Sequence, residues 1–419
     1  MDTSMHRGIF YGWRVVGAAF VLAAFGWGIG FYGPPVFLRV VCETRGWSVA
    51  FVSTAVTVHF LAGALAGASL PALHRSLGVA RVTKGGALAL AFGAFGWSIA
   101  TEPWQLIVAT LVSGTGWGAS SAAAVNAIVS PWFVRTRPAA LAMAYNGGSV
   151  GGIIFSPLWV AAIGAFGFPM AVAAIGLVMA LTMWVLADLL LSRTPQQMGL
   201  PPDGDAAGTP SPRLSSPTAR PLPGSLLWCD RNFLTLSAGM ALGLFAQIGL
   251  VAHLFSMLVP ALGVQQAGFV MGFVTVMAIV GRTLTGWLIP AAADRRLVAC
   301  AGYAVQLAGS VVFILAAGES IPLLLLGVAL FGTGFGNATS WSPLVAQVEF
   351  ADVDVPRVVA LIVGIAQGTY AFAPAIFGLI REFGPAVAGM SSGAAPSVFA
   401  AAALVQGAAI VAFLSGRRR

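Results

Sequence analysis

The chain has 419 residues, of which 58% are hydrophobic and 8% are charged, and its mean hydropathy is +0.90. A water-soluble protein is normally about one-quarter charged, so this composition excludes a soluble fold of this size. The net charge of +8 does not indicate nucleic-acid binding, because the basic residues are scattered singly between apolar stretches and are not gathered on one surface.

Apolar stretches long enough to cross a bilayer follow one another along the chain, each about 20 residues long. The opening MDTSMHRGIFYGW has no small-residue cleavage site, so we expect the first stretch to remain as a membrane helix. The spans predicted in the first half are 13–38, 50–73, 84–101, 105–130, 138–161 and 167–191. Those predicted in the second half are 231–258, 266–290, 297–317, 321–347, 357–380 and 396–415. The sequence therefore predicts an all-α membrane protein with twelve transmembrane helices.

A segment rich in Pro, Ser and Gly separates the two sets of spans. Its composition cannot bury a core and is typical of a flexible linker. We therefore expect an N-terminal six-helix bundle over residues 1–192, a cytoplasmic linker over 193–230, and a C-terminal six-helix bundle over 231–419.

The positions of the basic residues predict the orientation of the chain. If the N-terminus is cytoplasmic, 17 of the 21 Lys and Arg residues fall on the cytoplasmic side. Only Arg39, Arg45 and Arg381 fall outside, and Arg282 lies within a span. Positive charge collects on the cytoplasmic side of membrane proteins, so we expect both termini and the linker there.

The two halves resemble each other. GTGWGASS at 114–121 recurs as GTGFGNAT at 332–339, an offset of 218 residues. Pro157 and Pro374 are related by an offset of 217, and Gly67 and Gly286 by an offset of 219. Because each half has an even number of spans, the repeats have the same orientation. This organisation predicts parallel six-helix repeats with a substrate site between them, near the middle of the membrane.

Arg282 is the one charged residue between 267 and 290. An arginine in the middle of a span costs at least about 2.5 kcal/mol on insertion scales, so it must face protein, water or a counter-ion. The core spans contain no carboxylate for a fixed salt bridge, which favours a guanidinium that grips the carboxylate of a substrate. The alternative is an arginine capped by backbone carbonyls or part of a charge network at the cytoplasmic helix end.

Other polar residues in the spans are further candidates for contact with a substrate. His253 can change its charge near neutral pH, so it is our candidate for proton coupling as well as for substrate binding; the alternative is a histidine satisfied by a carbonyl. For His59 we expect a structural hydrogen bond. Aromatic and amide groups suit a mostly apolar site, although they also join membrane helices. The remaining candidates are Tyr370, Asn146, Tyr145, Asn126, Asn337, Trp341 and Gln367.

Several chemical functions find no support in the residues. No Ser/His/Asp set and no paired carboxylates are assembled, so we predict that the protein is not an enzyme. The three cysteines are too few and too far apart for a metal site or a disulfide framework. The glycine-rich motifs follow no strand, so they do not indicate a phosphate-binding loop. We expect no cofactor and no metal.

Several motifs together resemble the major facilitator superfamily, and within it the monocarboxylate-porter and oxalate/formate-antiporter branch. They are YGWRVV, RGWSVA, PWFVRTRPAALAMAYNGGSVGG, TPQQMGLPPDGD and GRTLTGWLIPAAADRRL. The resemblance covers nearly the whole chain. It implies a carboxylate-anchoring role for Arg282, a substrate contact for His253, and a gating loop containing Asp294, Arg295 and Arg296. In the first half, His74 and Arg75 stand where that loop usually carries an aspartate.

The sequence thus predicts a secondary transporter that moves a small organic anion, such as a monocarboxylate, by alternating access. We expect proton symport or anion exchange, a monomer, and a place in the lipid bilayer of the cell (inner) membrane. One alternative is an exporter of amphipathic or aromatic compounds, although exporters of cations usually need an acid within the membrane. A second alternative is a sensor that does not transport, but the chain carries no appended signalling domain.

Overall fold

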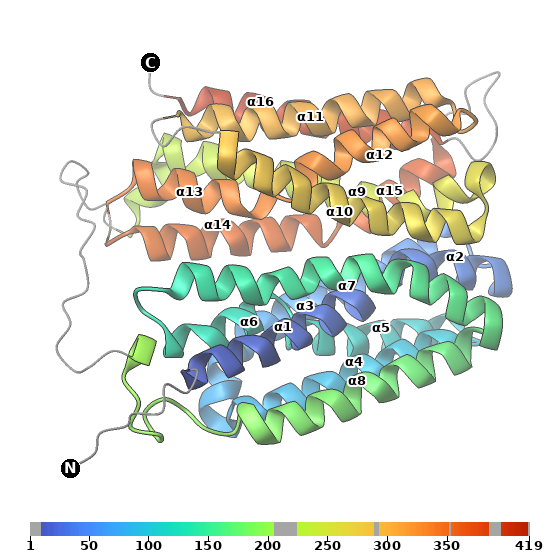
Figure 1. Ribbon diagram of the computed structural model, residues 1–419. Coiled ribbons are helices and arrows are strands. Elements are labelled where there is room, and N and C mark those ends of the chain that lie inside the picture. Colours follow the sequence, from blue (N-terminus) through green and yellow to red (C-terminus); the bar gives the residue numbers. More distant parts are fainter. Residues whose placement is uncertain (1–9, 205–223, 289–292, 352, 385–394, 418–419) are drawn as a thin grey trace, which may run out of the picture.

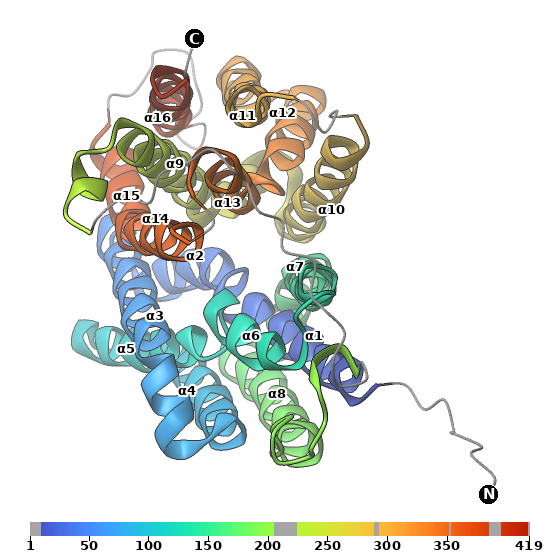
Figure 2. The same cartoon turned by 90° about the vertical axis from the view of Figure 1, so that its left-hand side faces the viewer.

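The computed structural model describes residues 10–204, 224–288, 293–351, 353–384 and 395–417, and in these residues all regular structure is helical. The helices form two groups that lie side by side, one from each half of the chain (Figure 1). Viewed along the helices, α1–α8 and α9–α16 form separate bundles with their faces turned toward each other (Figure 2). Both ends of the chain lie at the same end of the molecule (Figure 1).

The N-terminal half supplies six spans, of which the first and the fourth are each made of two helices. Its helices are α1 (Tyr11–Gly30), α2 (Gly33–Arg45), α3 (Val49–Leu77), α4 (Val79–Ile99), α5 (Pro103–Gly118), α6 (Ala122–Val129), α7 (Arg137–Phe166) and α8 (Phe168–Leu190).

The C-terminal half repeats this plan, with its fourth and fifth spans divided. Its helices are α9 (Arg231–Leu262), α10 (Val264–Leu288), α11 (Arg295–Ala316), α12 (Ile321–Phe335), α13 (Ala338–Glu349), α14 (Val355–Tyr370), α15 (Ala373–Phe383) and α16 (Pro396–Ser415). Short 3-10 turns lie at Ser130–Trp132, Pro202–Gly204 and Leu226–Cys229.

The helix ends follow from local sequence chemistry. Proline occupies the first or second position of eight of the described α-helices, where its missing N–H removes no hydrogen bond. Ser48 and Asp230 each cap a helix, because their side chains accept a hydrogen bond from the backbone N–H of Phe51 and Phe233. These caps replace the partners that the first turn of a helix lacks.

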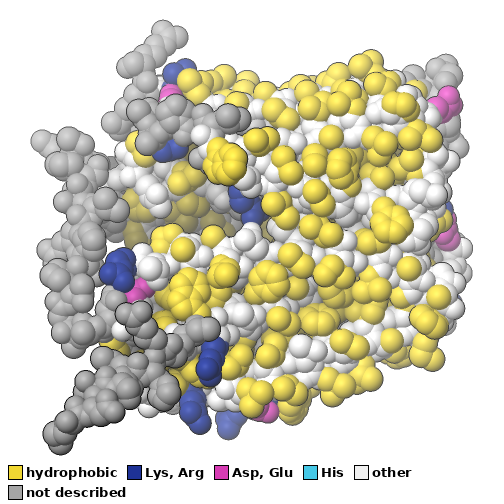
Figure 3. Space-filling model, in the orientation of Figure 1, with side chains coloured by type: hydrophobic (Ala, Val, Ile, Leu, Met, Phe, Trp, Pro, Cys, Tyr) yellow, Lys and Arg dark blue, Asp and Glu magenta, His cyan; other side chains and the backbone are white. Residues whose placement is uncertain are grey.

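The outer surface of the bundles is apolar. Eleven spans of the described residues are long and apolar enough to cross a membrane, and α4, with 21 residues, packs between α5 and α8 as the twelfth. Large hydrophobic side chains such as Leu177, Leu181 and Leu189 of α8 are more than half exposed, as expected for side chains facing lipid. On the face shown in Figure 3, hydrophobic side chains cover the broad side, and Lys and Arg gather mainly at the end that holds both termini. The predicted all-α, twelve-span fold is confirmed.

The helix breaks were not predicted. The fourth span of each half is interrupted, at residues 119–121 and 336–337, inside the repeated motifs GTGWGASS and GTGFGNAT. The first span extends to Arg45, beyond its predicted end at residue 38, because Pro34 lies in the first turn of α2 and begins a second helix. Hydropathy indicates that a stretch is apolar, but it does not predict where the helix within that stretch is interrupted.

The two halves are joined at the end away from the termini. The N–H of Ala50, at the start of α3, donates to Oε2 of Glu382 on α15 over 2.7 Å, and the N–H of Ala375 donates to Oγ1 of Thr57 over 3.1 Å. Helix α7 packs against α10 in the same interface. Toward the other end the surface is hollowed between the halves (Figure 3).

Candidate substrate-binding site

Arg282 extends from α10 toward the other half of the molecule. Its Nε donates to the carbonyl oxygen of Gly336 over 3.1 Å, and its Nη1 donates to Oδ1 of Asn146 on α7 over 3.4 Å. Among the described residues no carboxylate pairs with it. The guanidinium therefore lies between the halves with two neutral acceptors, and no carboxylate of the described residues neutralises its charge.

Asn337 holds the other side of this contact. It precedes α13, and its Nδ2 donates to the carbonyl oxygen of Gly281 over 3.2 Å and to Oγ1 of Thr285 over 2.9 Å. Arg282 thus bonds the residue before Asn337, and Asn337 bonds the residue before Arg282. This reciprocal pair of contacts fixes α10 against the break between α12 and α13.

Glycine makes that approach possible. A Cβ atom on Gly281 would lie 1.9 Å from the carbonyl oxygen of Thr333, and one on Gly336 would lie 2.0 Å from that of Ala278. The backbones of α10 and of the broken fourth span therefore touch, as small residues permit in membrane helices. The glycines of GTGFGNAT thereby set the position of Arg282.

The interface closes a short distance beyond Arg282. A Cβ atom on Gly152 of α7 would lie 2.6 Å both from Thr275 of α10 and from the ring of Tyr32. Thr275 and Tyr32 are buried, at 1% and 5% exposure. Thr275 is seven residues before Arg282, or about 10 Å along a helix. Tyr32 and Thr275 thus seal the end of the site that faces away from the termini.

Sequence reasoning missed Tyr32 and Thr275. Tyr32 is close enough to Arg282 to interact with its charge, although the two residues are 250 positions apart in the sequence. A signal was present in GFYGPP, where a tyrosine sits between glycine and two prolines inside an apolar span. Such a stretch indicates a break in the helix, and polar side chains at breaks in spans often point into a cavity.

The other candidate residues occupy several surroundings. Tyr145 donates to the carbonyl oxygen of Ala122 over 3.2 Å, across the break in the fourth span, and Oδ1 of Asn126 accepts from Oγ of Ser130 over 2.5 Å. On α14, Gln367 and Tyr370 are half-buried, and the ring of Tyr370 lies 6.2 Å from that of Phe60 on α3.

Trp341 packs inside the C-terminal half. It is 3% exposed, its ring lies 5.0 Å from that of Tyr303 on α11, and its Nε1 has no hydrogen-bond partner among the described residues. Two of the other predicted site residues lie in the hydrogen-bond network around Arg282. Asn146 bonds Arg282 itself, and Asn337 bonds the neighbouring Gly281.

Both intramembrane histidines are fully enclosed. Nε2 of His253 lies 3.1 Å from the carbonyl oxygen of Pro374, at the start of α15, and its Nδ1 has no partner among the described residues. His59 has both ring nitrogens occupied, by Oγ of Ser113 at 2.8 Å and by the carbonyl oxygen of Gly30 at 2.9 Å.

The expected gating loop joins elements of the C-terminal half. Asp294 caps α11 by accepting from the N–H of Arg296, and its Oδ2 pairs with Nε of Arg417 at 2.8 Å. Partial burial raises the pKa of Asp294, but the hydrogen bonds and the charge of Arg417 outweigh this effect, so that its pKa is lowered. Arg296 is 1% exposed and binds Glu349 through Nε at 2.6 Å and Nη2 at 2.8 Å. Arg295 begins α11.

One structural carboxylate was missed at the linker-side end of the N-terminal half. Asp203, in the TPQQMGLPPDGD motif, accepts hydrogen bonds from the N–H groups of Val134, Arg135 and Thr136 over 2.8 to 3.0 Å, and from Oγ1 of Thr136 over 2.5 Å. Slight burial raises the pKa of Asp203, but these hydrogen-bond donors outweigh this effect and lower its pKa to about 2. Two motifs noticed for their resemblance to one branch of a family therefore bind each other.

Two six-span bundles face each other across Arg282, an arrangement that the family comparison places among multi-pass membrane transporters and not among enzymes. The sequence profile of the Major Facilitator Superfamily matches residues 16–378, and the chain belongs to this superfamily. No curated protein matches the chain.

Solved structures of other transporters have the same fold. A bacterial homologue of the human lysosomal transporter Spinster, inward-facing and occupied, gives a TM-score of 0.73 at 14% identity, over 98% of this chain and 97% of that chain. The nucleoside transporter NupG gives 0.70 at 14% identity, over 97% and 99%. A D-xylose-proton symporter gives 0.71 at 13% identity, over 97% of both chains. At these identities the likeness concerns the fold alone.

Proposed function

We propose that the protein carries a small organic anion, a monocarboxylate, across the cell (inner) membrane by alternating access. The observation that carries this proposal is the charge of Arg282, which lies between the two halves with only neutral acceptors. A carboxylate would replace those weak partners with two parallel, charge-assisted hydrogen bonds. It would also neutralise a charge that is costly within a membrane.

Alternating access assigns a role to each end of the interface. The halves are joined through Glu382 and Thr57 at the end away from the termini and are hollowed apart at the other. With both termini in the cytoplasm, as the basic residues predict, this arrangement is the inward-facing state. Rocking of one half against the other about Arg282 would then expose the bound anion to the opposite side.

The contacts of the site supply its selectivity. Asn146 of the N-terminal half accepts from Nη1 of Arg282, which α10 carries in the C-terminal half, so an anion bound there would contact both halves at once. Asn337 positions Arg282 indirectly, through its bonds to Gly281 and Thr285. We expect Tyr32, Tyr370 and Gln367 to line the rest of the site. A site of this kind favours a small acid with one carboxylate, because the described residues offer one unneutralised cation there.

Counterflow in proteoliposomes tests this function. Purified protein is loaded with one organic acid, and the uptake of labelled acids from a panel is compared between wild type and Arg282→Gln. Arg14→Gln, at an exposed arginine near the start of α1, is the matched control. We expect one acid to exchange in the wild type and in the control and to be lost in Arg282→Gln. Exchange that survives in Arg282→Gln would overturn the role of Arg282, and a panel without any exchanged acid would favour an exporter of amphipathic compounds.

His253 is our candidate for proton coupling. It is buried against the start of α15, the helix whose far end contacts α3, and one of its ring nitrogens has no partner among the described residues. Protonation there would alter the packing of α15 and so the closure of the halves. Transport should fall as pH rises above the pKa of His253, and a His253→Gln variant that keeps the full pH dependence of accumulation would rule out His253 as the proton carrier.

A further inference from the structure

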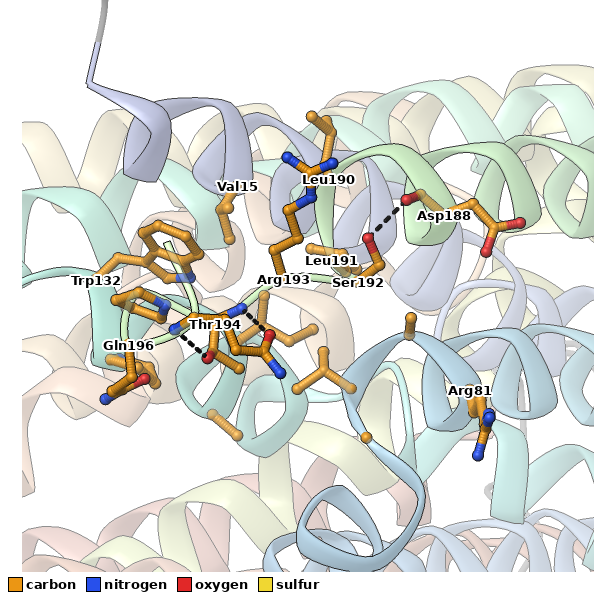
Figure 4. A pocket seen from close by; sticks show the side chains of 18 of the residues that line it. Val15, Arg81, Trp132, Asp188, Leu190, Leu191, Ser192, Arg193, Thr194 and Gln196 are labelled. Atoms are coloured by element: carbon orange, nitrogen blue, oxygen red, sulfur yellow. Dashed lines mark hydrogen bonds between the residues drawn. The ribbon is translucent and has the colours of Figure 1, made fainter. Parts of the chain in front are cut away.

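A cavity of about 580 Å³ opens at the end of the N-terminal half that carries the linker, away from Arg282. It lies between the beginning of α4, the end of α6 with the following turn, and the end of α8 with the first linker residues. Figure 4 shows Trp132 and Val15 on one side, Asp188 and Arg81 on the other, and Ser192 to Gln196 crossing between them.

The internal repeat shows what fills the equivalent space in the C-terminal half. There the guanidinium of Arg296 binds Glu349 and donates to the carbonyl oxygen of Phe413 over 3.2 Å. Subtracting the repeat offset of 218 from Arg296 and Glu349 gives Gly78 and Pro131, and Phe413, two residues before the end of α16, corresponds to Asp188, two residues before the end of α8. Gly78, Pro131 and Asp188 all line the cavity. The N-terminal half therefore has an open space where the C-terminal half has a buried ion pair.

The charges around the cavity are predominantly positive. Arg81, Lys84 and Arg193 line it together with one acid, Asp188. Lys84 is already engaged, because its Nζ lies 2.5 Å from Oδ1 of Asp188 and 4.5 Å from the centre of the Trp184 ring. Arg81 and Arg193 are exposed and form no hydrogen bond or ion pair within the described parts of the chain. Two cations are thus available to an anion in the cavity.

The cavity borders the apolar surface of the bundle. On α8, Trp184, Val185 and Leu189 are exposed just before the helix ends, and Leu77 at the end of α3 is 49% exposed. Trp184 beside Lys84 is an arrangement typical of the boundary between hydrocarbon and headgroups. A molecule with an anionic headgroup and apolar chains matches this combination of a basic cavity and exposed apolar side chains at its edge.

We propose that this cavity binds the phosphate-bearing headgroup of an anionic phospholipid from the cytoplasmic leaflet. Arg81 and Arg193 contact the phosphate, and the acyl chains lie along the exposed apolar residues of α8 and α3. Basic pockets between membrane helices on the cytoplasmic side are suited to such headgroups. The lipid supplies from outside the negative charge that Glu349 supplies in the other half. The proposal rests on the cytoplasmic placement of the linker and is independent of the transported substrate.

Thermal unfolding of the purified protein, titrated with lipid, tests the proposal. Three additions are compared: phosphatidylglycerol micelles, phosphatidylcholine micelles, and inorganic phosphate at the same phosphate concentration. The variant is Arg81→Gln/Arg193→Gln. The control is Arg14→Gln/Arg75→Gln, which removes the same charge from exposed positions outside the cavity lining.

We expect phosphatidylglycerol to raise the unfolding temperature of the wild type and the control at similar concentrations. The cavity variant should need at least about tenfold more lipid, because each basic residue near a membrane surface contributes several-fold to the binding of anionic lipid. An equal response of both double variants to phosphatidylglycerol would overturn the site. A full response to inorganic phosphate alone, or an equal response to phosphatidylcholine, would overturn its assignment to an anionic lipid. None of these outcomes depends on transport measured by counterflow, so failure of the lipid site is distinguishable from failure of the proposed function.

Discussion

The two halves repeat one fold, yet they stabilise their linker-side ends by different means. The C-terminal half has a buried pair there, in which Arg296, 1% exposed, binds both oxygens of Glu349. The N-terminal half has a cavity in the same place. Its nearest loop is held by Asp203, which comes from the segment after the sixth span. A duplicated fold can thus preserve its helices while the contacts that close its ends are replaced.

This difference bears on how the halves move. The Arg296 contacts reach α9, α13 and α16, so the end of the C-terminal half is joined as one unit. Asp203 instead ties the loop before α7 to the linker, and α7 carries Asn146, which contacts Arg282. Asp203 is therefore connected through α7 to the proposed substrate site at Arg282.

The largest effect is expected for Glu349→Gln. Removing one partner of a buried pair leaves the other charge uncompensated and typically costs about 3–5 kcal/mol. Asp188→Asn is the matched control in the other half, since its pair with Lys84 is partly exposed, and surface pairs contribute about 0–1 kcal/mol. Thermal unfolding followed by tryptophan fluorescence should show a far larger fall for Glu349→Gln. Equal falls would mean that the two ends are not stabilised differently.

A smaller effect is expected for Asp203→Asn. The neutral amide keeps one acceptor oxygen and points N–H groups at backbone donors, so we expect a loss of about 2 kcal/mol of local stability. Hydrogen–deuterium exchange at residues 133–137 should become roughly 30-fold faster, since 1.36 kcal/mol corresponds to a factor of ten. Glu319→Gln, at an exposed acid whose side chain forms no hydrogen bond or ion pair with the described residues, should leave that exchange unchanged. Unchanged exchange in Asp203→Asn would show that the carboxylate does not hold the loop.

The same carboxylate predicts a pH dependence. The pKa of Asp203 is lowered from 3.8 to about 2 in the folded protein, so the folded state binds fewer protons than the unfolded state in this range. Its contribution is fully present above about pH 4 and is lost as pH falls toward 2. Protection of residues 133–137 should therefore fall between these values in the wild type and stay flat in Asp203→Asn. A parallel fall in both proteins would assign the transition to other acids.

The smallest effect concerns the opposite end of the molecule. Glu382→Gln replaces the charged acceptor of the Ala50 N–H with a neutral one, which costs about 1 kcal/mol. The equilibrium between the two facing states should shift about fivefold toward the state open at that end. Spin labels placed on the ends of α3 and α15 would report the change in distance. An unchanged distance distribution would remove Glu382 from the closure.

The fold was predictable because hydropathy and charge act over whole spans. Twelve apolar stretches and one repeat offset were sufficient to predict two six-helix halves, and the structure confirms this architecture. The choice of Arg282 as a candidate also followed from sequence, because a charge in a span is costly wherever its neighbours are. The site itself stays a prediction.

Specific contacts were not predictable in this way. Arg296 and Glu349 are 53 residues apart, and Asp203 and Val134 are 69 apart, so nothing local marks them as partners. The burial of Trp341 beside Tyr303 also depends on which face of α13 turns inward. An apolar span in which nearly every residue is hydrophobic carries little information about that face.

Recognition of a carboxylate by the charge of Arg282 can be measured as the difference in equilibrium affinity between an acid and its uncharged amide. The acid identified by counterflow and its uncharged amide are each titrated into wild type and Arg282→Gln, which gives a complete thermodynamic cycle. We predict that the wild type prefers the acid by at least about tenfold, or 1.4 kcal/mol, and that Arg282→Gln loses this preference. A preference for the acid that is equally large in Arg282→Gln would contradict the claim and assign recognition of the anion to other residues.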